Sequence, residues 1–139
     1  MKMNTKGAAF LGMALALTVG ACVAQQQSAP AGEALAGNWQ VTSLVGGALP
    51  AGASVTLDFA GKTVSGNAGC NRYSGNFVQK GQALTFAPTA LTRMACAPML
   101  MDVESGFTKA LAAVNRYDMA ADTLRLFVGD TLIMQAQRR

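Results

Sequence analysis

The stretch SGNAGCNRYSGN, residues 65–76, sets one cysteine, Cys70, and one arginine, Arg72, among small residues that form turns. Glycine and asparagine supply the positive φ angles that turns and bulges need. Three readings suit such a stretch: it cradles an anion, holds a metal ion, or is fixed by a disulfide. Each hypothesis requires different residues elsewhere in the chain, so the rest of the sequence decides between them.

The N-terminus has the pattern of an export signal. Residues 1–21 carry Lys2 and Lys6, then an apolar run over residues 8–19, then small residues. The apolar run is shorter than the roughly 20 residues that span a bilayer. We therefore expect a signal peptide over residues 1–21, with an uncleaved anchor helix as the alternative.

Residues 19–22, Val-Gly-Ala-Cys, are similar to a bacterial lipobox, in which the cysteine takes the lipid. Ordinary cleavage after Ala21 is the alternative, but it leaves an odd cysteine without a role. Acyl chains on Cys22 would anchor the protein, because each buried methylene adds about 0.8 kcal/mol. The next residue is Val23 rather than Asp, so we expect the outer membrane, facing the periplasm, rather than the inner membrane.

Charge argues against nucleic acid as a partner. The 139-residue precursor has a formal net charge of +4, and cleavage after Ala21 would remove two lysines and no acid, leaving +2. The chain has no basic run and no stacked aromatic pattern; only Arg138 and Arg139 end it with paired charge. The expected partners are the membrane, through the lipid, and other envelope proteins.

Residues 22–36 are mostly Gln, Ser, Ala, Pro and Gly and predict a flexible tether. The length that remains suits one domain, over residues 37–137. Strand patterns lie around Trp39 and Val41, and three further segments predict hairpins with a glycine near each tip: 55–64, 77–86 and 124–134.

One segment departs from the strand period. Pro98 suits the first turn of a helix. The residues that follow share one apolar face by their helical spacing: Val103, Phe107, Ala110, Leu111 and Val114. Lys109 and Arg116 are placed toward the end of this helix. The predicted fold is mainly β with one α-helix, a small antiparallel barrel-like sheet packed with a helix.

The chain contains no histidine, which bears on both metal binding and catalysis. Cys70 and Cys96 would need further ligands for a closed zinc site, and no Ser-His-Asp or Cys-His constellation can be built. We therefore expect no catalytic residues, no metal and no cofactor. The anion reading lacks a Walker spacing and a helix that starts here.

Two thiols in a small exported domain usually pair. A Cys70–Cys96 disulfide would stabilise the fold by about 3–4 kcal/mol on the chain-entropy model. It would tie the glycine-rich stretch to the segment that leads into the helix. Two buried free cysteines are the alternative.

The sequence resembles the META/HslJ family of small bacterial envelope domains. The resemblance rests on two cysteine motifs, GNAGCNRYSG at 66–75 and TRMAC at 92–96, on the opening Gly37-Asn38-Trp39, and on Glu104, Phe107 and Leu111 downstream. It covers about residues 37–137. It implies a compact antiparallel, barrel-like sheet with a helix, and a loose association with heat shock, motility or secretion, and antibiotic tolerance.

Carried over residue by residue, the resemblance marks Asn71 for satisfying turn backbone and Met94 for filling the core. Arg72, Tyr73 and Arg93 form the candidate surface site. The favoured function is a lipid-anchored envelope protein with a structural or interaction role under stress. The alternatives are a binder of a small hydrophobic molecule inside the barrel and an enzyme of unknown type. The methionines from Met94 to Met101 are expected in the core rather than in a partner groove.

Overall fold

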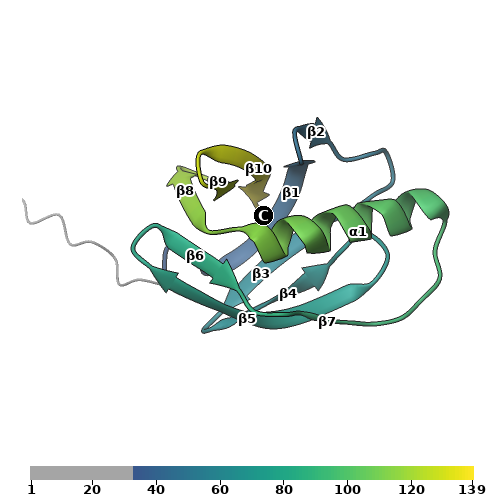
Figure 1. The fold of residues 1–139 in the computed structure, drawn as a ribbon, viewed down its shortest axis with the longest axis horizontal. Coiled ribbons are helices and arrows are strands. Elements are labelled where there is room, and N and C mark those ends of the chain that lie inside the picture. Colours follow the sequence, from purple (N-terminus) through teal and green to yellow (C-terminus); the bar gives the residue numbers. More distant parts are fainter. Residues whose placement is uncertain (1–32) are drawn as a thin grey trace, which may run out of the picture.

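The computed structural model describes residues 33–139. The predicted signal peptide, Cys22 and most of the predicted tether lie outside these residues. The described chain forms, in order, β1 (Gly37–Leu44), β2 (Gly47–Ala48), β3 (Thr56–Ala60), β4 (Thr63–Asn67), β5 (Arg72–Lys80), β6 (Ala83–Phe86), β7 (Ala90–Leu91), α1 (Pro98–Ala113), β8 (Arg116–Ala120), β9 (Thr123–Val128) and β10 (Thr131–Arg138) (Figure 1).

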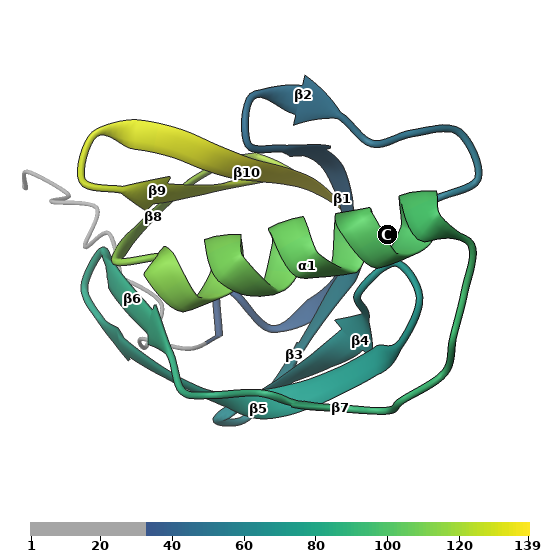
Figure 2. The same cartoon turned by 45° about the vertical axis from the view of Figure 1, so that its right-hand side comes forward.

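Eight of the strands close into an antiparallel barrel, with neighbours in the order β10-β9-β8-β6-β5-β4-β3-β1. Pairing between β1 and β10, from Trp39 opposite Arg138 to Leu44 opposite Met134, completes the circle. Figure 2 shows α1 running across the barrel, with β8–β10 on one side and β4–β7 on the other. The predicted fold class is thereby confirmed.

The three predicted hairpins are β3–β4, β5–β6 and β9–β10. Gly61, Gly81 and Gly129 stand at their tips with φ of 60°, 58° and 57°, the left-handed region that glycine enters without a Cβ clash. Alternation determines which side chains each strand buries: Leu124 and Leu126 of β9 face the core, and Arg125 between them is only partly buried.

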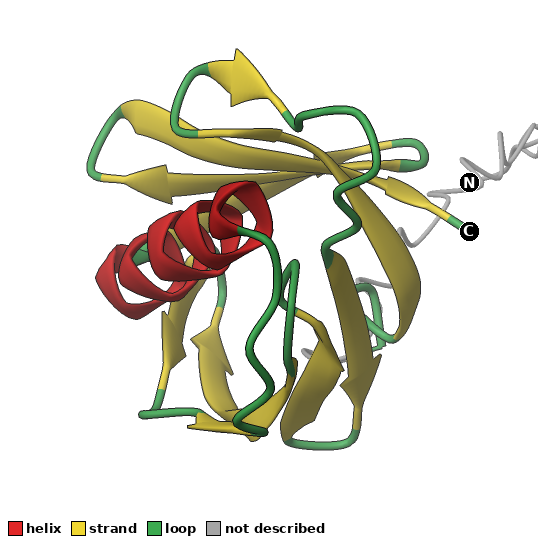
Figure 3. Ribbon diagram, turned by 90° about the vertical axis from the view of Figure 1, so that its right-hand side faces the viewer, coloured by secondary structure: helices red, strands yellow, loops and turns green. Residues whose placement is uncertain are grey.

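The helix begins at Pro98, as predicted, and buries Val103, Phe107, Ala110 and Leu111. It ends earlier than expected. Arg116 is not in its last turn but is the first residue of β8. Only Tyr117 of β8 is buried, so this strand shows little alternation in the sequence. β8 meets β6 through one pair, Ala83 with Arg116, and α1 packs beside this seam (Figure 3).

The domain begins before Gly37. Leu35, which the sequence analysis placed in the tether, is fully buried, and its carbonyl accepts the Trp39 indole N–H at 2.9 Å. The Arg138 guanidinium donates to the carbonyls of Ala34 and Ala36 and lies 4.2 Å from the Trp39 ring centroid. A single leucine among small residues forms no periodic pattern, so only the tertiary contacts show that Leu35 is a core residue.

The interior of the barrel is filled with side chains. The largest fully buried ones are Trp39, Phe107, Leu35, Leu57, Leu84, Leu111, Leu124, Leu126 and Met134. Tyr73 packs on Phe107 with ring centroids 5.0 Å apart. Within residues 33–139 no helix combines the length and apolarity needed to cross a bilayer.

Candidate functional site

The structure pairs Cys70 with Cys96. The S–S distance is 1.98 Å and the Cα atoms are 5.9 Å apart. Cys70 follows the end of β4, and Cys96 stands two residues before α1 begins. The disulfide therefore fixes the start of the helix to the turn between β4 and β5. It gives the stretch 65–76 a structural role.

Asn71, beside this disulfide, is buried and fully bonded. Its side-chain oxygen accepts from the Met94 N–H at 2.7 Å and the Thr92 hydroxyl at 2.9 Å. Its amide nitrogen donates to the Met94 carbonyl and to Glu104 Oε1, both at 3.2 Å. Asn71 thus joins the segment 92–94 and α1 to the turn. The backbone that its side chain satisfies is that of Met94, and not that of the turn itself, which the resemblance implied.

Glu104 completes this network from the helix. Its Oε2 accepts the Asn71 backbone N–H at 2.7 Å, while its Oε1 accepts the Asn71 side chain. From the sequence, Glu104 was identified only as part of the family pattern. One sequence signal for its role was available: Glu104 directly follows Val103 and so lies at the border of the buried face of the helix.

Two glycines of the opening stretch are explained by close packing. An added Cβ on Gly66, whose φ is +153°, would collide with the backbone carbonyl of Thr56. On Gly69 it would lie 3.0 Å from Val103 Cγ1 and 3.2 Å from the Leu100 carbonyl. The glycines thus let β4 approach β3 and let the turn approach α1, as tight packing requires.

Tyr73, predicted as part of a surface site, is mainly a core residue. It is buried, and its hydroxyl donates to the Thr56 carbonyl at 2.8 Å. Burial, with the negative charge of Asp58, raises the pKa of Tyr73 far above its ordinary value. Arg72 and Tyr73 are neighbours on β5, and successive strand residues point to opposite faces, so they cannot both face solvent on a strand that walls a filled barrel.

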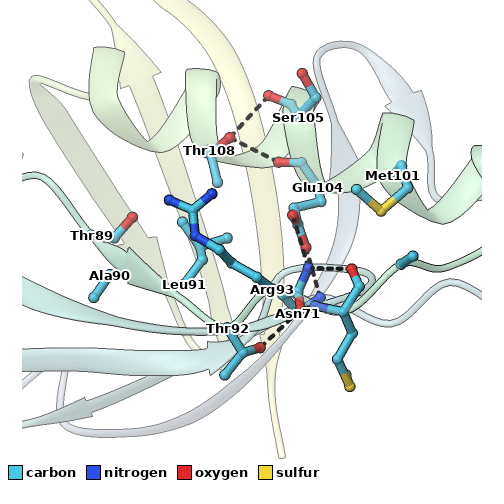
Figure 4. Close-up of a pocket in the computed structure, with 12 residues that line it drawn as sticks. Asn71, Thr89, Ala90, Leu91, Thr92, Arg93, Met101, Glu104, Ser105 and Thr108 are labelled. Carbon is cyan, nitrogen blue, oxygen red and sulfur yellow. Dashed lines mark hydrogen bonds between the residues drawn. The ribbon is translucent and has the colours of Figure 1, made fainter.

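A groove runs between α1 and the segment 89–95 (Figure 4). Its volume is about 720 Å³, and it is open to solvent. The lining is polar and apolar in comparable measure: Asn71, Thr89, Ala90, Leu91, Thr92, Arg93, Met94, Ala95, Met101, Glu104, Ser105 and Thr108. The disulfide and the Asn71 network hold its two walls together at one end.

The two candidate arginines lie on different sides of β7. Arg93 lines this groove and extends toward Thr108 of α1 (Figure 4). Arg72 lines a second groove of about 450 Å³, on the other side of Ala90–Thr92. Of the predicted cluster, Arg72 and the largely buried Tyr73 both border this second groove, whereas Arg93 lines the first.

Within residues 33–139, neither arginine has an acidic partner. Residues 33–139 contain six arginines, and four of them have a carboxylate oxygen within 3.9 Å: Arg116, Arg125, Arg138 and Arg139. Within this described part of the chain, Arg72 and Arg93 are the two without one. The segment 89–93 is thus flanked by two free positive charges.

The methionines near the groove are exposed, contrary to the expectation that they fill the core. The exposed fraction is 57% for Met94, 40% for Met99 and 38% for Met101. Met99 and Met101 precede Val103, which begins the buried face of α1, and Met94 projects from the segment that Asn71 holds by its backbone. The core positions are taken by the Val103–Phe107–Leu111 row instead.

Chemically, the groove offers hydroxyls, the Arg93 guanidinium and exposed thioethers, while its one side-chain amide, Asn71, is already fully bonded. The one carboxylate that lines it, Glu104, already accepts two hydrogen bonds from Asn71. Over the part of the chain that the structure describes, no three metal-binding Cys, Asp or Glu side chains gather together. The groups left unbonded in the groove can form hydrogen bonds and can pair with a negative charge.

Comparisons with known proteins agree with this fold. The family model of the META domain matches residues 33–139. A solved structure titled "NMR structure of the protein from Burkholderia xenovorans" is 28% identical with a TM-score of 0.62, covering 74% of this chain and 81% of its own. A second NMR structure is 25% identical with a TM-score of 0.58, covering 73% and 88%. No curated protein matches.

Proposed function

Because the chain belongs to the META domain family, we propose that it is a lipid-anchored, non-catalytic interaction protein of the bacterial cell envelope. Its contact surface is the groove between α1 and the segment 89–95, and its role lies in envelope stress or antibiotic tolerance. The observation that carries this proposal is the rigid frame of the groove, in which a disulfide and a bonded asparagine hold two walls in fixed positions.

The anchor is supported by the sequence. Cys22 follows an aliphatic and two small residues at the end of an export signal, and it remains single when Cys70 and Cys96 pair. Val23 favours the outer membrane, with the domain in the periplasm. A periplasmic location also suits the disulfide, which persists in an oxidising compartment.

A non-catalytic role is supported by the side chains that the groove offers. The chain has no histidine, and Glu104 is committed to Asn71. Arg93 supplies a charge that does not transfer protons near neutral pH. These groups recognise a partner through hydrogen bonds and charge rather than by proton transfer.

A hydrophobic ligand inside the barrel is the alternative function, and it has less support. Side chains fill the interior, with Trp39, Phe107 and Leu84 at most 1% exposed. Barrels of this size are normally filled in this way. The grooves described above open outside the barrel wall.

The anchor is tested by metabolic labelling with palmitate. We expect label on the wild-type protein in the membrane fraction and none on Cys22→Ala. Labelling of Cys22→Ala, or an unlabelled wild type, would contradict the anchor.

The contact surface is tested by photo-crosslinking in cells. A photoreactive amino acid replaces Ser105, an exposed residue of the groove, and in the control Thr131, an exposed residue of a hairpin tip. We expect discrete crosslinked proteins from position 105 and not from 131. Crosslinks equal at both positions, or none at 105, would remove the groove as the contact surface.

A further inference from the structure

None of the described strands pairs with the outer edge of β7. β6 and β7 follow one another along the same edge of β5, since β6 pairs with residues 77–80 and β7 with Tyr73 and Ser74. On its far side, β6 meets β8. β7 pairs with β5 alone among the described strands, and the space across from it is the groove, with α1 as its far wall.

The backbone of this edge is set for pairing. The Thr92 N–H bonds the Arg72 carbonyl at 3.0 Å, so Thr92 directs its backbone groups toward β5. In an antiparallel pair, alternate residues direct their N–H and C=O groups to opposite sides. Leu91 and Arg93 therefore direct theirs away from β5, toward the groove, where the Arg93 backbone has no hydrogen bond within residues 33–139.

The charge around this edge selects an acidic occupant. Arg93 in the groove and Arg72 on the other side of β7 have no carboxylate partner within residues 33–139. Glu104 is the opposing charge, and its two oxygens are already bonded by Asn71. An extended segment with Asp or Glu in this groove would complement both the free backbone edge and the Arg93 guanidinium.

We propose that the groove binds an extended, acidic segment of a partner protein by strand addition to the edge formed by Leu91 and Arg93, with the Arg93 guanidinium taking a carboxylate of that segment. This proposal rests on the proposed function and specifies its partner. At about 3.3 Å per residue, a segment of about six residues lies along positions 89–95.

Acidity is tested by selecting random peptides displayed on phage against the full chain in detergent micelles. We expect the selected peptides to be enriched in Asp and Glu, and to bind Arg93→Glu about tenfold or more weakly. Lys109→Glu is the matched control, because Lys109 is an exposed basic residue of α1 outside the groove lining. Selected peptides without acidic enrichment, or equally weakened by both variants, overturn the proposal.

Strand addition is tested on the tightest selected peptide by N-methylation of one backbone nitrogen at a time. Because strand hydrogen bonds face alternate sides, we expect methylation to weaken binding about tenfold at every second position and little between them. Weakening at all positions, or at none, overturns strand addition.

The outcomes separate this inference from the function on which it rests. If position 105 crosslinks to envelope proteins but acidic peptides fail to bind or show no alternation, strand addition is wrong and the contact surface stands. If position 105 gives no crosslink and no peptide binds, both are wrong.

Discussion

Asn71 shows how one side chain can organise a site. Its four hydrogen bonds to Thr92, Met94 and Glu104 connect a turn, an extended segment and a helix. Because Asn71 is buried, losing any of these bonds is costly: an unpaired polar group away from water costs roughly 1–3 kcal/mol. The amide is suited to this position because it both donates and accepts.

We therefore predict that Asn71→Ala lowers the free energy of unfolding by at least about 2 kcal/mol, since it leaves the Met94 backbone groups without their partner. Asn76→Ala, at an exposed position of β5 with no side-chain hydrogen bond in the structure, is the control and should change it by less than about 0.5 kcal/mol. Urea unfolding with the disulfide intact measures both. Equal changes in the two variants would contradict the role of Asn71.

Tyr73 gives the fold a dependence on alkaline pH. Its pKa is raised in the folded protein by burial and by Asp58, above the ordinary value of 10.0 that applies when unfolded. The neutral phenol is therefore the form that the fold favours. Its contribution is fully present below about pH 10 and is lost as pH rises above that value.

For Tyr73→Phe we expect stability about 1 kcal/mol lower at neutral pH, because the hydrogen bond to Thr56 is lost. Between about pH 9 and 11, however, the stability of the variant should fall less steeply than that of the wild type. Short-exposure urea unfolding at each pH measures the two slopes. Equal pH dependence in the wild type and the variant would show that the pKa of Tyr73 does not differ between the folded and unfolded states.

At the scale of elements, the structure depends on how α1 is held against the sheet. The helix buries one face, Val103, Phe107 and Leu111, and crosses the region where β6 and β8 share one pair. Its N-terminal end has no side-chain cap and is fixed instead by the disulfide and by Glu104 with Asn71. The groove exists because the helix, rather than a strand, lies beside β7.

Removing the disulfide should loosen this end of the helix. The bond closes a span of 26 residues, for which the chain-entropy model gives about 3–4 kcal/mol. We expect the Cys70→Ala/Cys96→Ala double variant to lose about that much stability. We also expect the exchange rates of the amide hydrogens near residues 98–104 to rise more than those of β9. An equal rise in both elements would show that the disulfide does not hold the helix locally.

At the scale of the whole molecule, the barrel closes where the two ends of the domain meet. β1 pairs with β10, and Arg138 bonds the carbonyls of Ala34 and Ala36 across 102 or more residues of sequence. The same guanidinium lies over Trp39, the chain's one tryptophan. The point where the described chain begins is thus fixed to the barrel seam.

Arg138→Met should destabilise the fold by about 1–2 kcal/mol, because the two carbonyl bonds and the cation–π contact are lost while the aliphatic stem remains. We expect a change in Trp39 fluorescence of the folded protein as well. Lys62→Met, at an exposed tip residue, is the control. Unchanged fluorescence and stability in Arg138→Met would show that the seam does not need this residue.

The sequence by itself determined the β-rich class, the three hairpins and the helix start, because alternation, tip glycines and Pro98 act within a few residues. The sequence also predicted the Cys70–Cys96 disulfide, which the structure contains. Which side chains are buried and where the groove forms were decided by the tertiary structure alone. Tyr73 is buried and Met94 exposed because inward and outward faces depend on how β5 and β7 pair. Leu35 and the groove follow from contacts between segments far apart in the chain, which no local pattern records, and only such contacts show what Glu104 binds.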